Sequence, residues 1–446
     1  MKIPESLAAR TTTRSLARFR WPALLLLVPP AAAVVYVVMF ATATPLTDEW
    51  LMLGAAVDLH KHGWSLHTLR SIQIQHHQHL LIVPYLIYLP LEALFRYDTR
   101  ALVGVTLACF GVQFTVFRSQ LVKDDLAAFP IALLLFSPSH YMEFHWGFQF
   151  TLALSITFPV VALALLDHIG DDITRVNIRR YLIGTVLLVC GALSSAPGYF
   201  GFCSAVLLIT LKPLRARTKI VLSLSWIFIL ALIYFGIVRP QSDEHTIGVR
   251  EVLYVLTALG CVIWGSPVGL FKFGVDKNSL TGLAFILALV VVLARFRRHL
   301  SSLALPIALI AFGLGSIAAA ATSRPYLGNW HLQLVLPAVC GIYAAVYVAW
   351  RRDRSLFSSA LLASVVLLLL FTLEGYRLGF TVYGPSYRTY VSQIEHYILS
   401  YSPSLEKPFP HPGDRDIDAE MIEFLREKHH RLFETHQDRR TRPGRP

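Results

Sequence analysis

The chain has little charge for its length, and its acids are scarce. Only 15% of its 446 residues are charged, and 55% are hydrophobic. An average soluble domain has about 25% charged residues. Long apolar runs recur from residue 22 to residue 373. They do not alternate polar and apolar residues as barrel strands do, and only helices satisfy their own backbone in lipid at these lengths. The composition therefore predicts an all-α polytopic membrane protein.

Several chemical signatures are missing from the sequence. The five cysteines lie inside apolar runs without CxxC spacing, which argues against a disulfide framework or a zinc site. No Walker loop, GxSxG elbow or GxGxxG motif is present, which argues against an ATP-driven pump or a Rossmann enzyme. The net charge of +12 accompanies no basic-aromatic module, so we expect no nucleic-acid partner.

The basic residues predict the orientation of the chain. Four arginines between Arg10 and Arg20 precede an apolar run that ends at Ala43. That run is too long for a signal peptide, so we expect an uncleaved first helix with residues 1–21 in the cytoplasm. Further basic clusters predict cytoplasmic loops. They occupy residues 118–123, 175–180, 212–219, 295–299 and 351–354.

The apolar segments set the expected topology. Approximate spans are 22–43, 79–95, 100–117, 126–138, 147–167, 180–194, 197–211, 218–238, 252–271, 279–295, 303–322, 331–350 and 357–373. All basic loops share one side if 79–95 and 252–271 do not cross. This gives about eleven transmembrane helices plus periplasmic juxtamembrane helices, with the C-terminus outside. We expect a transmembrane domain over 22–373 and a periplasmic tail over 374–446, partly helical between Ile417 and Phe433 and disordered at its end. The location expected is a bacterial inner membrane.

In this topology the polar, aromatic-rich stretches collect on the periplasmic side. They are residues 44–78, 138–146, 194–200, 239–251, 323–330 and the tail. Such clustering is typical of a site built by loops above a helical scaffold, although ordinary exposed loops give a similar pattern.

Asp48 and Glu49, which follow the first apolar run, are the leading catalytic candidates. A carboxylate at a helix end accepts a proton from a hydroxyl or binds a divalent cation. The structural alternative is that Thr47, Asp48 and Glu49 cap a helix beginning near Trp50. The two roles are compatible, because one acid can cap while the other works.

Further candidates are histidines, an acid and an arginine. His76 and His79 end a histidine-rich stretch, where contacts to phosphate or sugar hydroxyls, or a wet interface, are favoured over a zinc site. Glu143 lies among aromatics that suit a carbohydrate site, while Trp146 also fits an interfacial aromatic belt. Arg324 is suited to gripping a phosphate, with snorkelling to lipid headgroups as the alternative.

These residues together resemble the GT-C superfamily of integral-membrane glycosyltransferases, in a bacterial branch similar to the aminoarabinose and protein-mannosyl transferases. The resemblance spans roughly residues 20–373 in order, and only the combination of its short motifs is specific. The matching elements are Thr47-Asp48-Glu49-Trp50, then Ser137-Pro138 with Glu143 and Trp146 to Gln149, then Ser323-Arg324 with Pro325 intruding before Tyr326.

The resemblance implies an inverting transfer from a polyprenyl-phosphate sugar to a glycan or lipid acceptor in the cell envelope. Asp48 would be the general base, Glu49 or Glu143 would position the acceptor or a divalent cation, and Arg324 would bind the donor phosphate. Gln149, Tyr326, His76 and His79 are the other expected substrate contacts.

One departure from the family pattern concerns the first loop. Many relatives carry Asn-Glu-His-Arg where this chain has His77-Gln78-His79-Leu80, which removes an acid and a base. A non-catalytic relative therefore stays an alternative, as does a transporter or flippase of lipid-linked sugars.

Overall fold

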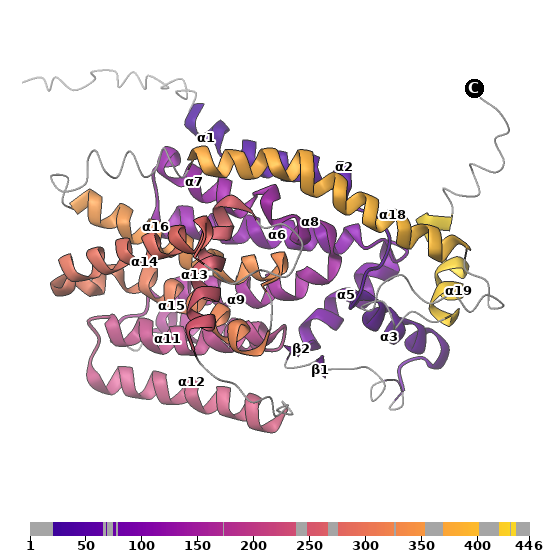
Figure 1. Ribbon diagram of the computed structural model, residues 1–446. Coiled ribbons are helices and arrows are strands. Elements are labelled where there is room, and N and C mark those ends of the chain that lie inside the picture. The colour runs from indigo at the N-terminus through magenta and orange to yellow at the C-terminus, as the bar shows by residue number, and fades with distance from the viewer. Residues whose placement is uncertain are drawn as a thin grey trace, which may run out of the picture.

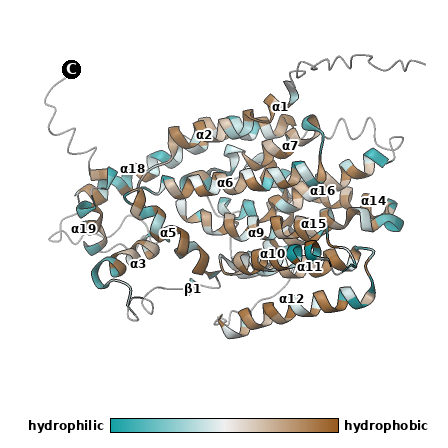
Figure 2. Ribbon diagram, turned by 180° about the vertical axis from the view of Figure 1, so that it is seen from behind, coloured by the Kyte–Doolittle hydropathy of each residue, from teal (hydrophilic) through white to brown (hydrophobic). Residues whose placement is uncertain are grey.

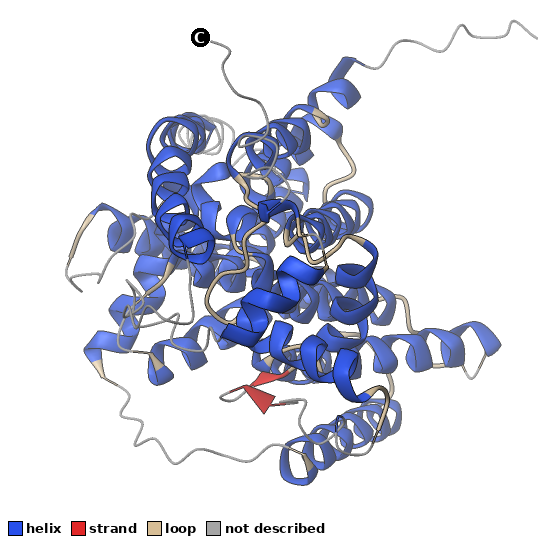
Figure 3. Ribbon diagram, turned by 90° about the vertical axis from the view of Figure 1, so that its right-hand side faces the viewer, coloured by secondary structure: helices blue, strands red, loops and turns tan. Residues whose placement is uncertain are grey.

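The computed structural model describes residues 21–65, 68, 75–76, 79–172, 174–237, 248–265, 275–324, 327–352, 369–400, 419–428 and 430–433. Within them the chain is helical apart from two short strands, drawn red in Figure 3. The all-α polytopic architecture expected from composition is confirmed.

Seven helices among the described residues are long and apolar enough to cross a membrane. They are α1–α2 (Trp21–Leu25, Val28–Phe40), α6–η1 (Arg100–Val116, Phe117–Leu121), η3–α9 (Gly147–Gln149, Phe150–Leu166), α12 (Ala216–Gly236), α14 (Lys277–Arg295), η5–α15 (Arg297–Leu303, Ala304–Ser323) and η6–α16 (Asn329–His331, Leu332–Arg352). Most of their residues are apolar (Figure 2), and many apolar side chains on α2, α12 and α14 are exposed. On α12, Val221, Phe228 and Phe235 are exposed, as suits a lipid-facing helix.

Shorter helices complete the bundle. They are α5 (Ile82–Leu94), α7 (Asp125–Leu135), η2 (Pro138–His140), α8 (Tyr141–His145), α10 (Arg175–Ala192), η4 (Ala196–Gly198), α11 (Tyr199–Leu211) and α13 (Val249–Trp264). α13 ends at Gly265, whose positive φ of 72° a glycine adopts without strain. The predicted segment 252–271 is thus helical only in its first part among the described residues. Most of segment 357–373 lies outside them, and the count of eleven crossings stays a prediction.

Local sequence signals begin several of these helices. Asp124 accepts a hydrogen bond from the Ala127 N–H at 3.0 Å and caps α7, and Asp276 accepts from the Ser279 N–H at 2.8 Å and caps α14. Such caps satisfy backbone donors that a helix start leaves unpaired.

The predicted basic loops meet in two groups. Arg295, Arg297, Arg298, His299 and Arg352 line one pocket of about 560 Å³, so the loops after α14 and α16 lie together. The loop before α10 contacts the loop after α11, because the Arg215 N–H donates to Asp171 at 2.8 Å. These two pairs include four of the five predicted basic loops, and each pair agrees with the topology, while the assignment to the cytoplasm stays a prediction.

The opposite end of the bundle carries the smaller elements (Figure 1). There α3 (Glu49–His62) lies near α5 and α19 (Ala419–Glu427), beside strands β1 (Gln75–His76) and β2 (His79–Leu80). Two further elements, η7 (Gly379–Tyr383) and α18 (Gly384–Ser400), follow α2 along one edge. Helix α3, which follows the first apolar helix, and the C-terminal helix α19 therefore lie at one end of the molecule.

Helices α13 and α14 pack through glycines. A Cβ at Gly260 would lie 2.0 Å from the Asn278 carbonyl oxygen, and one at Gly282 would lie 1.9 Å from the Leu256 carbonyl oxygen. The two backbones can approach this closely only because no side chain stands between them.

Substituting Gly260→Ala should therefore separate α13 from α14 and destabilise the protein by about 1–3 kcal/mol, the usual cost of overpacking. Gly111→Ala on α6 is the matched control, because nothing lies within 4 Å of a Cβ there. Thermal unfolding in detergent, followed by size-exclusion fluorescence, measures both. Equal melting temperatures for the two variants would contradict this account of the packing.

Candidate functional site

A cavity of about 960 Å³ opens where the loops at this end of the bundle meet. Its lining comes from five of the six polar stretches that the sequence placed together, the exception being 239–251. The lining residues within those stretches are Thr47, Asp48, His76, Tyr141, Met142, Trp146, Ser195, Ala196, Pro197, Phe200, Ser323, Arg324, Trp330 and, from the tail, Val382, Tyr383, Ser386, Tyr387 and Tyr390. The prediction that these stretches build one site is consistent with this geometry.

Asp48 stands at the start of α3, and its carboxylate lines the cavity. It occupies the N-cap position, yet its side chain accepts no capping hydrogen bond from the helix. The preceding Thr47 has a φ of 43°, which is strained for a β-branched residue. Strain of this kind clusters at functional sites, where surrounding contacts hold it in place.

Glu49 faces away from the cavity and is 1% exposed. Its carboxylate accepts hydrogen bonds from the Leu46 N–H at 2.6 Å and the Phe148 N–H at 2.9 Å. A Cβ at position 147 would lie 2.3 Å from a Glu49 oxygen, so Gly147 makes room for it. Burial raises the pKa of Glu49 well above its usual range, although these backbone N–H groups oppose the shift. Glu49 therefore ties the first loop to the segment after α8.

Trp146 reinforces the same junction. Its indole Nε1–H donates to the Leu46 carbonyl at 3.1 Å, and its ring stacks on Phe148 with centroids 5.8 Å apart. Trp330 meets Trp146 edge-on at 5.9 Å. All three rings line the cavity and form one aromatic wall.

Strands β1 and β2 present two histidines. Their antiparallel register pairs His76 with His79, and both side chains line the cavity. The His76 Nε2 lies 3.6 Å from Asp48 Oδ1, and its ring meets Phe148 edge-on at 6.1 Å.

His79, His331 and Arg324 form a second polar group in the cavity lining. The His79 Nδ1 accepts from the Ala196 N–H at 3.2 Å and bonds the Ser195 hydroxyl at 2.8 Å. The His331 Nδ1 accepts from the Gly328 N–H at 3.1 Å. Because Nδ1 is an acceptor in both rings, each neutral imidazole carries its proton on Nε2. Arg324 and His79 each lie near enough to His331 to act on it electrostatically.

A second aromatic wall comes from the end of the chain. Tyr141 stacks on Tyr383 with centroids 5.2 Å apart, and Tyr387 lies 6.0 Å from Tyr141. Sequence analysis did not single out these tyrosines, nor Ser195, Trp330 and His331. The tyrosine spacing in residues 383–390 was the available signal, but a surface helix gives the same pattern.

The remaining predicted residues have different placements. Gln149 lines the cavity and accepts a hydrogen bond from the Gln333 amide at 2.9 Å. Glu143 is 0% exposed and is not part of the lining, and neither carboxyl oxygen has a hydrogen-bond partner among the described residues. Burial raises its pKa well above the usual range. Tyr326 lies outside the described residues.

The described residues contain no group of three or more histidine, cysteine or acidic side chains arranged to hold a metal ion. These residues therefore show no ligand set for the divalent cation that the sequence allowed at Asp48 and Glu49.

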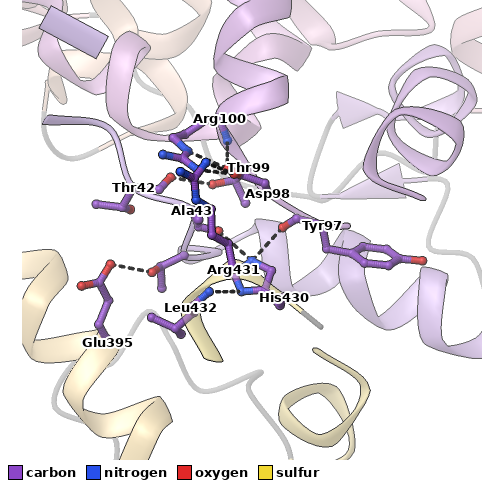
Figure 4. A network of polar contacts seen from close by, with 11 residues as sticks. Thr42, Ala43, Tyr97, Asp98, Thr99, Arg100, Glu395, His430, Arg431 and Leu432 are labelled. Carbon is purple, nitrogen blue, oxygen red and sulfur yellow. Dashed lines mark hydrogen bonds and ion pairs between the residues drawn. The ribbon is translucent and has the colours of Figure 1, made fainter. Parts of the chain in front are cut away.

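A C-terminal segment clasps the base of the first loop (Figure 4). The buried His430 bonds through Nε2 to the Ala43 and Tyr97 carbonyls, each at 3.0 Å, while its Nδ1 accepts from the Leu432 N–H at 3.2 Å. From α18, Glu395 accepts from the Thr44 hydroxyl at 2.9 Å. These contacts hold the linker that leads into Asp48.

Comparisons with known proteins give one structural likeness. No protein-family model and no curated protein matches the chain. Among solved structures, the chain is similar to a crystal structure of ArnT from Cupriavidus metallidurans in the apo state. The TM-score is 0.45 and the identity 15%, covering 92% of this chain and 77% of that chain.

Glu49→Gln should destabilise the protein, because an amide leaves one of the Leu46 and Phe148 donors without an acceptor. An unsatisfied buried group costs about 1–3 kcal/mol. Asp48→Asn is the matched control, since that side chain faces the cavity and caps nothing. Melting temperatures in detergent measure the difference. A Glu49→Gln protein as stable as Asp48→Asn would contradict the anchoring role.

His430 should make stability fall on acidification. Burial lowers the pKa of His430, although Asp98 and the two carbonyls oppose the shift. The unfolded chain, with an ordinary histidine pKa of about 6.5, then binds the proton first. Stability is therefore present above about pH 6.5 and is lost as the pH falls below it.

The substitution His430→Gln keeps a side-chain N–H that can donate to one of the two carbonyls, and it removes the imidazole that titrates. Its melting temperature should be lower at neutral pH, and it should fall less than the wild type between about pH 7.5 and 5.5. His62→Gln, at the exposed end of α3, should retain the wild-type pH dependence. Identical pH dependence in all three proteins would contradict the assignment.

Proposed function

We propose that this chain is a membrane glycosyltransferase that moves a sugar from a polyprenyl-phosphate donor to the hydroxyl of a periplasmic lipid, polysaccharide or protein glycan. One observation carries the proposal. A single cavity combines a carboxylate, an arginine flanked by imidazole donors, and two aromatic walls. These are the groups needed to accept a proton, hold a phosphate and bind sugar rings.

The donor phosphate is assigned to Arg324, His79 and His331. A guanidinium grips phosphate oxygens with two parallel hydrogen bonds, and an imidazole with its proton on Nε2 adds a donor without a permanent charge. The last turn of α15 adds small residues, among them Ala319, Ala320 and Ser323, to the lining beside Arg324. These leave room for a bulky lipid phosphate.

Asp48 is assigned as the general base. The acceptor oxygen attacks the anomeric carbon from the face opposite the phosphate, which leaves with the electron pair of the broken bond. Attack from the opposite face inverts the configuration at that carbon. The acceptor proton passes to the Asp48 carboxylate. Glu49 is assigned to holding the loop, because its carboxylate is already used by the backbone. No step requires a cation.

The aromatic walls are assigned to the sugars. Trp146, Phe148 and Trp330 offer ring faces and edges, and the side chain of Gln149 offers polar atoms for hydroxyl groups. Small-molecule sites commonly combine apolar surface with a few fixed polar groups in this way.

The test is sugar transfer by the purified protein in lipid vesicles, with a panel of radiolabelled polyprenyl-phosphate sugars as donors and cell-envelope glycolipids as acceptors. Asp48→Asn should lower the transfer rate by about 10²–10⁴-fold, the usual contribution of a general base. Asp58→Asn, on the same helix but outside the cavity lining, is the control and should keep wild-type activity.

Unchanged transfer by Asp48→Asn would remove the assignment of the base. The transporter alternative is tested by a cysteine at position 48, which an alternating-access carrier exposes to impermeant thiol reagents from both sides of the membrane. Labelling from one side only supports the enzyme.

A further inference from the structure

His76 lies where an acid–base partner of Asp48 would lie. Two neighbours position it: the β-ladder pairs its backbone with that of His79, and its ring meets Phe148 edge-on with centroids 6.1 Å apart. Directly paired residues on antiparallel strands project to the same face, and both histidines line the cavity. The two-stranded ladder thus places the imidazole of His76 beside Asp48 and that of His79 in the group with Arg324 and His331.

The separation of His76 and Asp48 suits proton exchange. His76 Nε2 and Asp48 Oδ1 are 3.6 Å apart, and the two side chains are 18% and 34% exposed. Catalytic hydrogen bonds are often this long without substrate and shorten when it binds. A side-chain adjustment of under about 1 Å reaches hydrogen-bond distance.

We propose that Asp48 and His76 act as one acid–base pair, in which His76 takes the acceptor proton from Asp48 and passes it to solvent. The proposal rests on the proposed function and deepens it. A carboxylate is ordinarily a weaker base than an imidazole, so a proton taken by a carboxylate moves on to a neighbouring imidazole with a gain in free energy.

The proton inventory balances at each step. The acceptor O–H bond breaks as the new glycosidic bond forms, and its proton joins Asp48 Oδ1. That proton then passes to the lone pair of His76 Nε2, which restores the aspartate and leaves an imidazolium. The phosphate leaves with the electrons of its bond to the sugar, and the imidazolium releases its proton to solvent through the cavity mouth.

The surroundings of His76 determine its pH response. Asp48 faces it from α3, His79 from β2, and Arg324 and His331 belong to the second polar group of the same cavity. Glu49 faces away. Among these residues Asp48 is the carboxylate beside the ring, and Arg324 is the permanent cation of the cavity lining. Because the pair needs a neutral imidazole at the start of each turnover, activity should fall as acid protonates His76.

The kinetic test compares His76→Asn with the wild type and with His62→Asn, the control outside the cavity. His76→Asn should lower kcat about tenfold or more with little change in KM, because the lost interaction acts on proton transfer and not on binding. It should also remove the acid limb of the kcat profile. His62→Asn should change neither. Wild-type kcat and pH profile in His76→Asn, with Asp48→Asn inactive, would overturn the pair and leave the proposed function intact.

A second measurement needs no sugar transfer. Diethyl pyrocarbonate modifies neutral imidazoles, and mass spectrometry of the full-length protein in nanodiscs reports modification at His76. In Asp48→Asn the rate of this modification should change about threefold, because the charged group 3.6 Å from the reacting nitrogen is gone. Asp58→Asn should label at the wild-type rate. Equal modification rates in Asp48→Asn and the wild type would overturn the acid–base pair, whether or not sugar transfer is detected. Failure of the wild type to transfer any donor sugar would refute the proposed function separately.

Discussion

The buried carboxylate of Glu49 is the constraint on which the site depends. An acid placed in a protein interior is costly unless donors surround it. Here those donors are the Leu46 and Phe148 N–H groups, which belong to two loops far apart in sequence. Consecutive helical residues point about 100° apart, so fixing Glu49 inward turns its neighbour Asp48 toward the cavity. The same contact thus holds the loop and aims the proposed base.

A second set of contacts makes this arrangement depend on the end of the chain. The linker from Thr42 to Thr44 is bonded by Thr99, by Glu395 and by His430, so its position is set from α6, α18 and the clasp together. Tyr383 and Tyr387 of the second aromatic wall lie in the same C-terminal region, on η7 and α18. Residues that line the cavity and a residue that supports the linker therefore both lie on η7 and α18.

The sequence predicted the features that local patterns control. The length of the apolar runs predicted the helices. The collection of polar loops on one side predicted a common site, and Asp48, Arg324, His76 and His79 do line one cavity. It did not separate the roles of Asp48 and Glu49, because which acid is buried depends on a glycine about one hundred residues away. It also assigned Glu143 to substrate, whereas packing encloses that side chain. Burial arises from tertiary contacts, and a polar residue between aromatics gives no local sign of it.

The altered first-loop motif acquires a physical meaning from this geometry. His77-Gln78-His79-Leu80 lacks the acid and the base of the family pattern, yet β2 still brings an imidazole to the cavity. A sugar phosphodiester carries one negative charge, which Arg324 alone balances. The leaving phosphate monoester carries close to two. As the bond to the sugar breaks, the second negative charge develops on the phosphate oxygens. The neutral Nε2–H donors assigned to His79 and His331 bond those oxygens more strongly as their charge grows. Under the proposed function, exchanging a permanent cation for neutral donors therefore weakens attraction to the substrate phosphodiester more than it weakens stabilisation of the transition state.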